Sequence, residues 1–203
     1  YFLHNGNLYF CIGDVSGKGI PASLFLSATH YLFRSAAESY DKIDRAAAAI
    51  NRSLNTDNEQ NMFVTFFCGK LDLGTGILEF CNAGHNSPIL ITPTNDVKAA
   101  FLSPNHGIAL GVMDLDVFKL ETIQLESGDT LFLYTDGVTE SMNANNTELG
   151  NDETLRCITE HATQNSKGIV EAMYKRILQH ADGTVQSDDI TMLCIRYKKE
   201  GQE

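Results

Sequence analysis

The sequence predicts an α+β fold in which layers of antiparallel sheet are covered by helices. Apolar residues alternate with a period of two at both ends and through the middle of the chain, and they follow a helical period in two separate pairs of segments. Strands and helices do not alternate along the chain, so a doubly wound parallel sheet is not expected. With 203 residues, 43% of them hydrophobic, the chain can bury the core of one domain, residues 1–203.

A β-hairpin opens the chain. Asn5-Gly6, the strongest two-residue turn signal, separates apolar stretches over residues 1–3 and 8–12. Both stretches therefore read as antiparallel strands. Counting back from the turn gives the pairs Leu3 with Leu8, Phe2 with Tyr9, and Tyr1 with Phe10.

Two helices are expected after the hairpin and two more near the end of the chain. Pro21 suits the first turn of a helix that runs to about residue 37. The second helix is expected over residues 41–54 with Asp41 as its N-cap. The later helices are expected over residues 152–162 and 166–181. The expected inner faces are Ile43, Ala46, Ala47 and Ile50 in the second helix, and Ile169, Val170, Met173, Tyr174, Ile177 and Leu178 in the fourth.

Strands are expected between the two pairs of helices and at the end of the chain. Glycine-rich turns separate the first of them, and the residues between these turns follow the strand period. The expected strands cover residues 62–70, 77–81, 89–91, 117–125, 130–134 and 190–197.

The chain is acidic, and this charge limits its partners. It contains 26 Asp and Glu residues against 15 Lys and Arg residues, a net charge of -11. Such a charge repels nucleic acid and anionic membranes, so we expect neither as a partner. A phosphorylated substrate would require cations, which clustered carboxylates could hold. No apolar run approaches the roughly 20 residues that span a membrane, and no signal peptide is visible.

The five cysteines are scattered and never spaced as CxxC. Four of them lie in strand-like apolar runs, where buried reduced thiols are expected, and this favours a reducing compartment such as the cytoplasm. The chain begins within a strand pattern, so we expect an excised domain whose parent protein can be membrane-anchored. The cysteines are Cys11, Cys68, Cys81, Cys157 and Cys194.

The segment GDVSGKGIP, residues 13–21, has the composition of a phosphate-binding loop. A Walker loop would require glycine in place of Ile12 and Ser or Thr in place of Gly19. Residues 17–22 match the dinucleotide-binding pattern G-x-G-x-x-A, but the following element is another helix instead of the required strand. Nucleotide binding therefore remains a weak alternative, and the glycines are better explained by a tight strand-to-helix turn.

Aspartates stand at the ends of three apolar strands. Asp14 ends the second strand of the hairpin, Asp136 ends the strand over residues 130–134, and Asp188-Asp189 precede the last strand. One such aspartate is normally a turn or cap residue. We expect the three strands to be central, and carboxylates gathered at one edge of a core repel each other unless they are protonated or bridged by a cation. Oxygen ligands without His or Cys favour magnesium or manganese over zinc.

Four ordered motifs resemble those of the metal-dependent protein serine/threonine phosphatases (PPM, type 2C), in the bacterial SpoIIE/RsbU branch. They are GDVSGKG at residues 13–19, NAGHNSP at 82–88, YTDGVTE at 134–140 and SDDIT at 187–191. The resemblance covers essentially the whole chain. It implies a four-layer α-β-β-α sandwich of two packed antiparallel sheets flanked by helices.

The resemblance also implies a metal centre. Asp14 would bridge two divalent cations, Mn²⁺ or Mg²⁺, with the backbone carbonyl of Val15 as a further ligand. Asp136 and Asp188 would complete the cluster, and Asp189 would be a supporting or secondary ligand. The implied reaction is direct hydrolysis of phosphoserine or phosphothreonine by metal-activated water. The implied substrate is a phosphorylated signalling protein, a STAS-type anti-sigma antagonist, and the parent chain would carry an upstream sensor domain.

The chain departs from the family pattern before its first strand. Relatives carry an acidic motif resembling G-G-D-F-Y-D there, and this chain starts after that position. We therefore expect the fragment to bind metal weakly or incompletely and to show little activity until the upstream residues are restored. Full activity of the fragment would contradict this expectation. The alternative function is a catalytically impaired phosphatase-fold module that binds or regulates a partner.

Three further residues in these motifs have simpler explanations than catalysis. His85 could assist proton transfer, but a structural hydrogen bond in its tight loop is favoured. Lys18 could steer phosphate, and a solvated lysine at a helix start is equally expected. Ser16 lacks a neighbouring base, so a capping hydroxyl is favoured over a nucleophile.

Overall fold

The computed structural model describes residues 1–56, 58–93, 98–102, 107–114, 118–186 and 188–199. The chain divides into two compact units. Unit 1 comprises Tyr1–His85 and Pro104–Leu125, and unit 2 comprises Asn86–Ser103 and Glu126–Glu203. No helix in the described part of the chain is long and apolar enough to cross a membrane.

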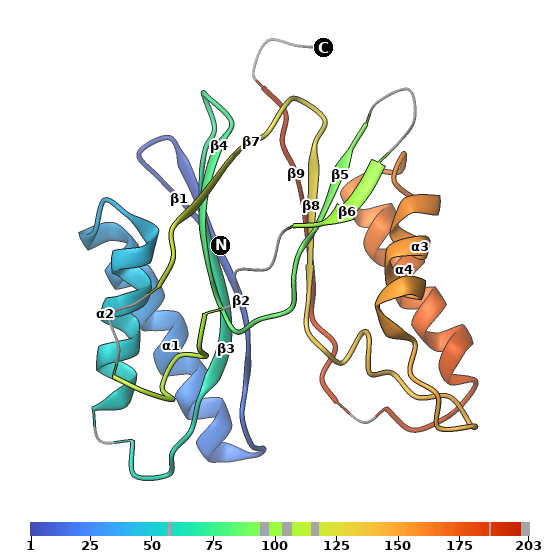
Figure 1. The fold of residues 1–203 in the computed structure, drawn as a ribbon, viewed down its shortest axis with the longest axis horizontal. Helices are drawn as coiled ribbons and strands as arrows, with labels where there is room; N and C mark the ends of the chain where they lie inside the picture. Colours follow the sequence, from blue (N-terminus) through green and yellow to red (C-terminus); the bar gives the residue numbers. More distant parts are fainter. Residues whose placement is uncertain (57, 94–97, 103–106, 115–117, 187, 200–203) are drawn as a thin grey trace. The chain divides into compact units, whose positions relative to one another are not determined.

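Unit 1 is a five-stranded antiparallel sheet with two helices on one face (Figure 1). The strand order is β1-β2-β3-β4-β7. The helices pack against the sheet through an apolar cluster that includes Tyr9, Phe33, Ile50 and Cys68. The elements are β1 (Phe2–His4), β2 (Asn7–Val15), α1 (Ile20–Ser39), α2 (Ile43–Asn55), β3 (Val64–Asp72), β4 (Ile77–Ala83) and β7 (Glu121–Gln124).

Unit 2 is a four-stranded antiparallel sheet, also with two helices on one face (Figure 1). The strand order is β6-β5-β8-β9. Its core joins Phe132 and Tyr134 of the sheet to Ile158 and Met173 of the helices. The elements are β5 (Ile89–Thr92), β6 (Lys98–Phe101), β8 (Thr130–Tyr134), α3 (Gly150–Glu160), α4 (Ser166–Ala181) and β9 (Met192–Arg196).

Two antiparallel sheets and four helices confirm the predicted α+β class. All strand pairs described are antiparallel, so the parallel unit that a dinucleotide-binding fingerprint requires does not form in this part of the chain. β6 was not predicted, because Lys98-Ala-Ala-Phe101 carries only one large apolar residue and gives little strand signal.

The predicted hairpin and most of its register are confirmed. Leu3 lies opposite Leu8 and Phe2 opposite Tyr9. Asn5 and Gly6 both have positive φ, 48° and 75°, as the tight turn of a two-residue hairpin requires. The expected Tyr1–Phe10 pair lies outside the ladder, which ends at the Phe2–Tyr9 pair.

Two elements of unit 1 begin at later residues than predicted. α2 begins at Ile43 with Lys42 in the N-cap position, so the prediction of Asp41 as N-cap was wrong. β3 begins at Val64, since Asn58 binds both backbone groups of Met62: its Oδ1 accepts from the amide at 3.0 Å and its Nδ2 donates to the carbonyl at 2.7 Å.

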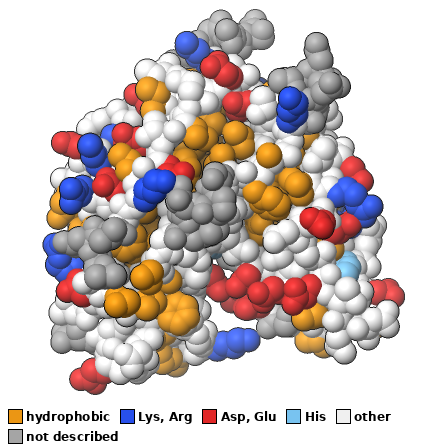
Figure 2. Space-filling model, in the orientation of Figure 1, with side chains coloured by type: hydrophobic (Ala, Val, Ile, Leu, Met, Phe, Trp, Pro, Cys, Tyr) orange, Lys and Arg blue, Asp and Glu red, His pale blue; other side chains and the backbone are white. Residues whose placement is uncertain are grey.

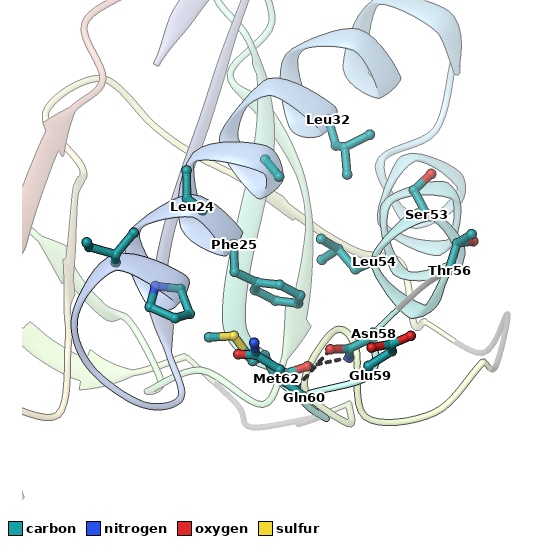
Figure 3. Close-up of a pocket in the computed structure, with 13 residues that line it drawn as sticks. Leu24, Phe25, Leu32, Ser53, Leu54, Thr56, Asn58, Glu59, Gln60 and Met62 are labelled. Carbon is teal, nitrogen blue, oxygen red and sulfur yellow. Dashed lines mark hydrogen bonds between the residues drawn. The ribbon is translucent and has the colours of Figure 1, made fainter.

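A groove lies between α1, the end of α2 and the segment that leads to β3. Its volume is about 490 Å³, and Figure 3 shows Leu24 and Phe25 of α1 on one side and Leu54 of α2 on the other. The bonds between Asn58 and Met62 close one end of the groove. The groove belongs to unit 1 alone.

The inner face of α2 is confirmed and that of α4 is only half right. Ile43, Ala46, Ala47 and Ile50 are all buried. In α4, Ile169, Met173 and Ile177 are buried, but Tyr174 is 48% and Leu178 is 54% exposed. The apolar stripe of α4 is therefore wider than the part that enters the core.

All five cysteines are free thiols. Of the four cysteines predicted to be buried in strands, Cys68 and Cys81 are buried, whereas Cys11 and Cys194 are half-buried. Cys157, in α3, is buried as well. Cys68 lies opposite both Cys11 and Cys81 in the sheet of unit 1. Burial raises the pKa of Cys11 to about 12 and that of Cys194 to about 11, so these thiols stay protonated at neutral pH.

Candidate metal centre

In unit 2, the end of β8 and the approach to β9 bring two of the predicted acidic motifs together. β8 and β9 are antiparallel neighbours with Tyr134 opposite Met192, so Asp136 and Asp188-Asp189 lie just beyond the same end of the strand pair. Thr135 links the two segments by hydrogen bonds, although Asp189 lies 54 residues later in the chain. Its hydroxyl donates to the carbonyl of Asp189 at 3.0 Å and accepts from the amide of Thr191 at 3.0 Å, and its own amide donates to the carbonyl of Thr191 at 3.1 Å.

Gly137 explains why glycine follows the aspartate in this motif. A Cβ atom at this position would lie 2.4 Å from the carbonyl oxygen of Asp189 and 3.4 Å from that of Asp188. Any larger residue would push the 188–189 segment away from β8, because two non-bonded heavy atoms do not approach so closely. The T-D-G sequence thus holds Asp136 beside the Asp188-Asp189 pair.

Negative charge gathers at this corner. Asp136 Oδ1 is buried and has no hydrogen-bond partner in the described part of the chain. Burial raises the pKa of Glu140, and the negative charges of Asp136, Glu148 and Asp188 raise it further. Asp188 Oδ1 accepts from the amide of Asp189 at 2.8 Å. An unpartnered buried oxygen among oxygen donors fits a hard divalent cation such as Mg²⁺ or Mn²⁺.

In unit 1, Asp14 lies within β2, one residue before its end. Asp14 is half-buried and lies opposite Thr65 of β3. Because side chains alternate along a strand, it shares a sheet face with Phe10 and Ile12, whereas Tyr9 and Val15 face the helices. Gly13 keeps β2 close to β3, since a Cβ there would lie 2.8 Å from the carbonyl oxygen of Thr65.

The backbone carbonyl of Val15 is left out of the β2–β3 ladder. The amide of Ser16 donates to the carbonyl of Phe63 at 2.8 Å, so Ser16 and Phe63 occupy a hydrogen-bonded position of the ladder. Hydrogen-bonded and non-hydrogen-bonded positions alternate in an antiparallel pair. Val15, opposite Val64, therefore occupies a non-hydrogen-bonded position and directs its carbonyl away from β3. This carbonyl can serve as a metal ligand without breaking the sheet.

His85 has the structural role that the sequence favoured. Its Nδ1 and the hydroxyl of Thr65 are 3.0 Å apart, and the Thr65 hydroxyl also donates to the carbonyl of Asp14 at 3.4 Å. Asn82 closes the loop: its Oδ1 accepts from the amide of His85 at 2.8 Å and its Nδ2 donates to the carbonyl of His85 at 2.9 Å. The loop motif thus supports the strand that carries Asp14.

The glycines of residues 13–21 form the predicted strand-to-helix turn, but the prediction for Ser16 was wrong. Gly17 and Gly19 adopt positive φ of 85° and 81°, a conformation that favours glycine. Gly19 occupies the N-cap of α1, and no side chain caps this helix. The Ser16 hydroxyl instead accepts from the amide of Phe63 at 2.9 Å and extends the β2–β3 pairing.

One premise of the sequence argument was wrong, and two residues of the corner were missed. β2 and β8 are interior strands, but β9, which follows Asp188-Asp189, is the last strand in the order of its sheet. Thr135 and Glu140 were not recognised as part of the corner. Both belong to the YTDGVTE motif, and their roles depend on a partner segment that the local sequence does not indicate.

The comparisons with known proteins agree with this geometry. The family model described as "Stage II sporulation protein E (SpoIIE)" matches residues 4–198. Protein IcfG of Synechocystis is 27% identical over 222 residues, which cover 96% of this chain and 34% of that protein. Phosphoserine phosphatase RsbU of Bacillus subtilis is 27% identical over 196 residues, which cover 95% of this chain and 56% of that protein. The chain thus spans about a third to about half of the length of these relatives.

Solved structures share the fold. The RsbU and RsbW domains of a Mycobacterium tuberculosis protein match with a TM-score of 0.79 at 23% identity, covering 95% of this chain and 52% of that one. RsbX in complex with magnesium matches with a TM-score of 0.66 at 18% identity, covering 95% of this chain and 82% of that one. At these identities the likeness concerns the arrangement of the backbone.

Proposed function

Since the chain belongs to the SpoIIE family, we propose that it is a metal-dependent protein serine/threonine phosphatase domain that hydrolyses phosphoserine or phosphothreonine on a signalling protein. The observation that carries this proposal is the family match over residues 4–198, a span that includes Asp14, Asp136 and Asp188-Asp189. The phosphoserine phosphatase RsbU among its relatives adds support.

The proposed metal ligands are the residues that the family motifs indicate. Asp14 and the Val15 carbonyl of unit 1, together with Asp136 and Asp188 of unit 2, would hold two divalent cations, Mn²⁺ or Mg²⁺, with Asp189 in a supporting role. Each of the three aspartates Asp14, Asp136 and Asp188 is half-buried and offers a carboxylate oxygen. The unpartnered Oδ1 of Asp136 and the magnesium in the RsbX structure support this assignment. Bound cations of this kind lower the pKa of a water molecule and neutralise the charge of a phosphate group.

The residues of this chain would supply position and charge to the reaction. Thr135 and Gly137 fix the Asp136 and Asp188 backbones relative to each other, so the ligands need little rearrangement when cations bind. Asp188 Oδ1 already accepts from the Asp189 amide, which orients the carboxylate. His85, Thr65 and Asn82 would hold the β2 end in the same way for Asp14. The reaction needs no nucleophilic side chain, in agreement with the structural role of Ser16.

The proposed substrate is a phosphorylated STAS-type anti-sigma antagonist in the cytoplasm, and the proposed parent chain carries an upstream sensor domain. The similarity to RsbU, and to a solved protein in which RsbU and RsbW domains occur together, supports this class of substrate. The longer relatives support a parent chain with further domains. No nucleic acid or membrane contact is proposed for this acidic domain.

Phosphate release from a phosphoserine peptide tests the proposal. With the upstream residues restored, hydrolysis is expected with MnCl₂ or MgCl₂ and should disappear when EDTA is added. Asp136→Ala should abolish hydrolysis and retain binding of the phosphorylated protein partner, because the substitution removes a ligand from the edge of the sheet and leaves the core intact. If the chain with its upstream residues restored binds the phosphorylated partner but releases no phosphate with either cation, the alternative of a non-catalytic binding module is supported.

A further inference from the structure

Three large apolar side chains remain exposed in the described part of unit 2, and they lie together. Tyr174 is 48%, Leu178 54% and Val185 88% exposed. All three line a cavity of about 60 Å³, together with Ser141, Met142 and Gln186. The half of the α4 stripe that does not enter the core therefore forms one wall of a small apolar depression.

The segments around this cavity are held in place by backbone bonds. Asp182, the residue after α4, caps the C-terminus of the helix. It has a left-handed conformation with φ of 42°, and its amide donates to the carbonyl of Leu178 at 3.1 Å. The amide of Thr184 donates to the carbonyl of Ala181 at 2.8 Å and turns the chain back over α4. His180 Nε2 lies 2.9 Å from the carbonyl oxygen of Thr147, which connects α4 to the loop after Met142. These bonds position the end of α4 and the first residues after it.

The same segments lead directly to the proposed metal ligands. The amide of Glu140 donates to the carbonyl of Asp136 at 2.8 Å, and Ser141 and Met142 follow at once in the chain. On the other wall, the side-chain amide of Gln186 donates to the carbonyl of Asp188. A ligand that reaches from Asp136 and Asp188 along the surface of unit 2 would therefore meet this cavity.

Two of the segments that line the cavity are acidic, whereas α4 carries Lys175 and Arg176 next to Tyr174. Residues 135–155 and 177–195 contain no Lys or Arg. Acidic side chains gather in a band on the face drawn in Figure 2. The negative potential of such a surface favours a cationic partner. The carboxylates in these two segments are Asp136, Glu140, Glu148, Asp152, Glu153, Asp182, Asp188 and Asp189.

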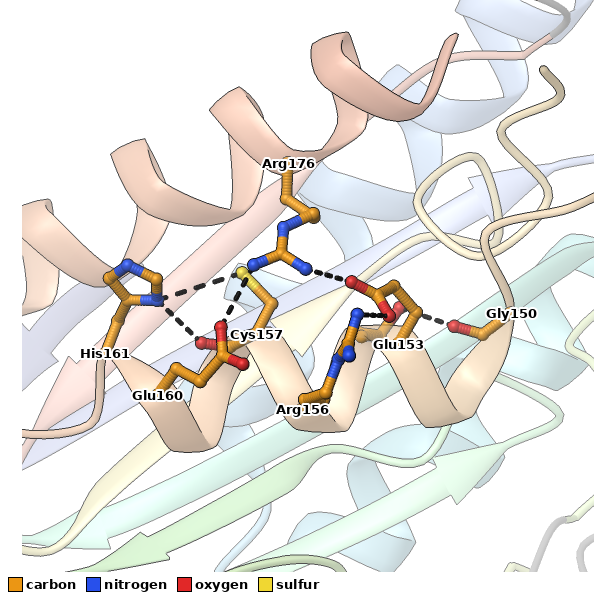
Figure 4. A network of polar contacts seen from close by, with 8 residues as sticks. Gly150, Glu153, Arg156, Cys157, Glu160, His161 and Arg176 are labelled. Atoms are coloured by element: carbon orange, nitrogen blue, oxygen red, sulfur yellow. Dashed lines mark hydrogen bonds and ion pairs between the residues drawn. The ribbon is translucent and has the colours of Figure 1, made fainter. Parts of the chain in front are cut away.

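Acidic and basic side chains of α3 and α4 form ion pairs with one another. Arg176 contacts both Glu153 and Glu160, and Arg156 also contacts Glu153 (Figure 4). These ion pairs offset the negative charge of Glu153 and Glu160, so Glu153 of segment 135–155 is already paired within the fold. Glu140 and Glu148, which are not among the proposed metal ligands, have no such arginine in their own segment.

We propose that the surface formed by Tyr174, Leu178, Val185 and Met142 binds the protein substrate beside its phosphorylated residue. The cavity would take one apolar side chain of the substrate, and the neighbouring carboxylates that are not metal ligands, Glu140 and Glu148, would bind a Lys or Arg side chain. The proposal rests on the phosphatase function proposed above, because it uses Asp136 and Asp188 to place the phosphate. It assigns the substrate a mixed apolar and basic sequence around the phosphorylated serine or threonine.

Binding of unphosphorylated product peptides tests this surface without requiring turnover. Fluorescein-labelled serine peptides with one Leu and two Arg residues near the serine are compared by fluorescence anisotropy with peptides in which Glu replaces Arg. The wild-type protein is expected to prefer the Arg peptide. Val185→Asp should weaken this binding about tenfold, the usual effect of losing one apolar contact in a pocket. Val112→Asp, the same substitution at a 48% exposed position of unit 1, is the matched control and should leave the affinity unchanged.

The two proposals fail in different measurements. Equal affinity of the wild-type protein and the Val185→Asp variant, or equal affinity for Arg and Glu peptides, would overturn the docking surface whatever the phosphate assay shows. Peptide binding that depends on Val185, combined with no phosphate release by the chain with its upstream residues restored, would support the surface and contradict the phosphatase function.

Discussion

The two ends of β8 carry the same two residue types in opposite order. Gly128-Asp129 precedes the strand and Asp136-Gly137 follows it. Each aspartate keeps a buried Oδ1 without a hydrogen-bond partner in the described part of the chain. Asp136 lies near Glu140 and Asp188, whereas Asp129 shares a turn with Glu126. The residue types at the two ends are therefore the same, and their surroundings differ.

Asp129 closes a turn. It is 5% exposed, its Oδ2 accepts from the amide of Glu126 at 2.9 Å, and its own amide donates to the carbonyl of Glu126 at 3.0 Å. Asp136 instead lies beside Asp188 and Glu140, and the charges of both aspartates raise the pKa of Glu140. An aspartate at a strand end becomes a candidate ligand only when another chain segment brings further carboxylates to it.

Manganese affinity should give the largest difference between the two ends. Asp136→Asn is expected to lower Mn²⁺ affinity by about 100-fold or more, because even indirect partners of a metal ligand contribute about 10–100-fold. Asp129→Asn should leave it unchanged, since this residue serves a turn. Isothermal titration calorimetry measures both variants. Similar losses in the two variants would show that the Asp136 end is no more specialised than the Asp129 end.

The glycines provide the next contrast. Gly137→Ala should cost about 1–3 kcal/mol of stability by forcing its Cβ against the Asp189 carbonyl, and it should also weaken Mn²⁺ binding. Gly128→Ala should cost about 1–2 kcal/mol because alanine is strained at a φ of 103°, without weakening Mn²⁺ binding. Urea denaturation and metal titration of both variants test this. Normal metal binding by Gly137→Ala would argue against the positioning role of this glycine.

The pH dependence of stability should give the smallest effect. Burial raises the pKa of Asp129 above its ordinary value of 3.8, so the folded protein binds this proton more tightly than the unfolded chain. The stability contributed by the neutral form is therefore present at low pH and is lost as the pH rises above 3.8. Asp129→Asn stays neutral, so its melting temperature relative to the wild-type protein should rise between acid and neutral pH. A constant difference across this range would contradict the assignment.

The sequence by itself determined the local structure. The Asn5-Gly6 turn, the register of the hairpin, the buried face of α2 and the span of α4 all follow from turn chemistry and periodicity, which depend on residues close together in the chain. The motifs also identified Asp136 and Asp188-Asp189 as residues of one corner. The turn, the register and the two helices were predictable because their causes are local, whereas the meeting of Asp136 with Asp188-Asp189 was expected from the strand ends and the family resemblance.

Tertiary structure decided which of these residues meet. The hydrogen bond from Thr135 to Asp189 spans 54 residues, and the close approach at Gly137 depends on the pairing of β8 with β9. The tertiary structure also placed the Ser16 hydroxyl against the amide of Phe63, and it left Tyr174 and Leu178 of the α4 apolar stripe exposed. Periodicity reports which side of an element is apolar, whereas strand order and neighbouring segments determine what covers that side and which polar groups face each other.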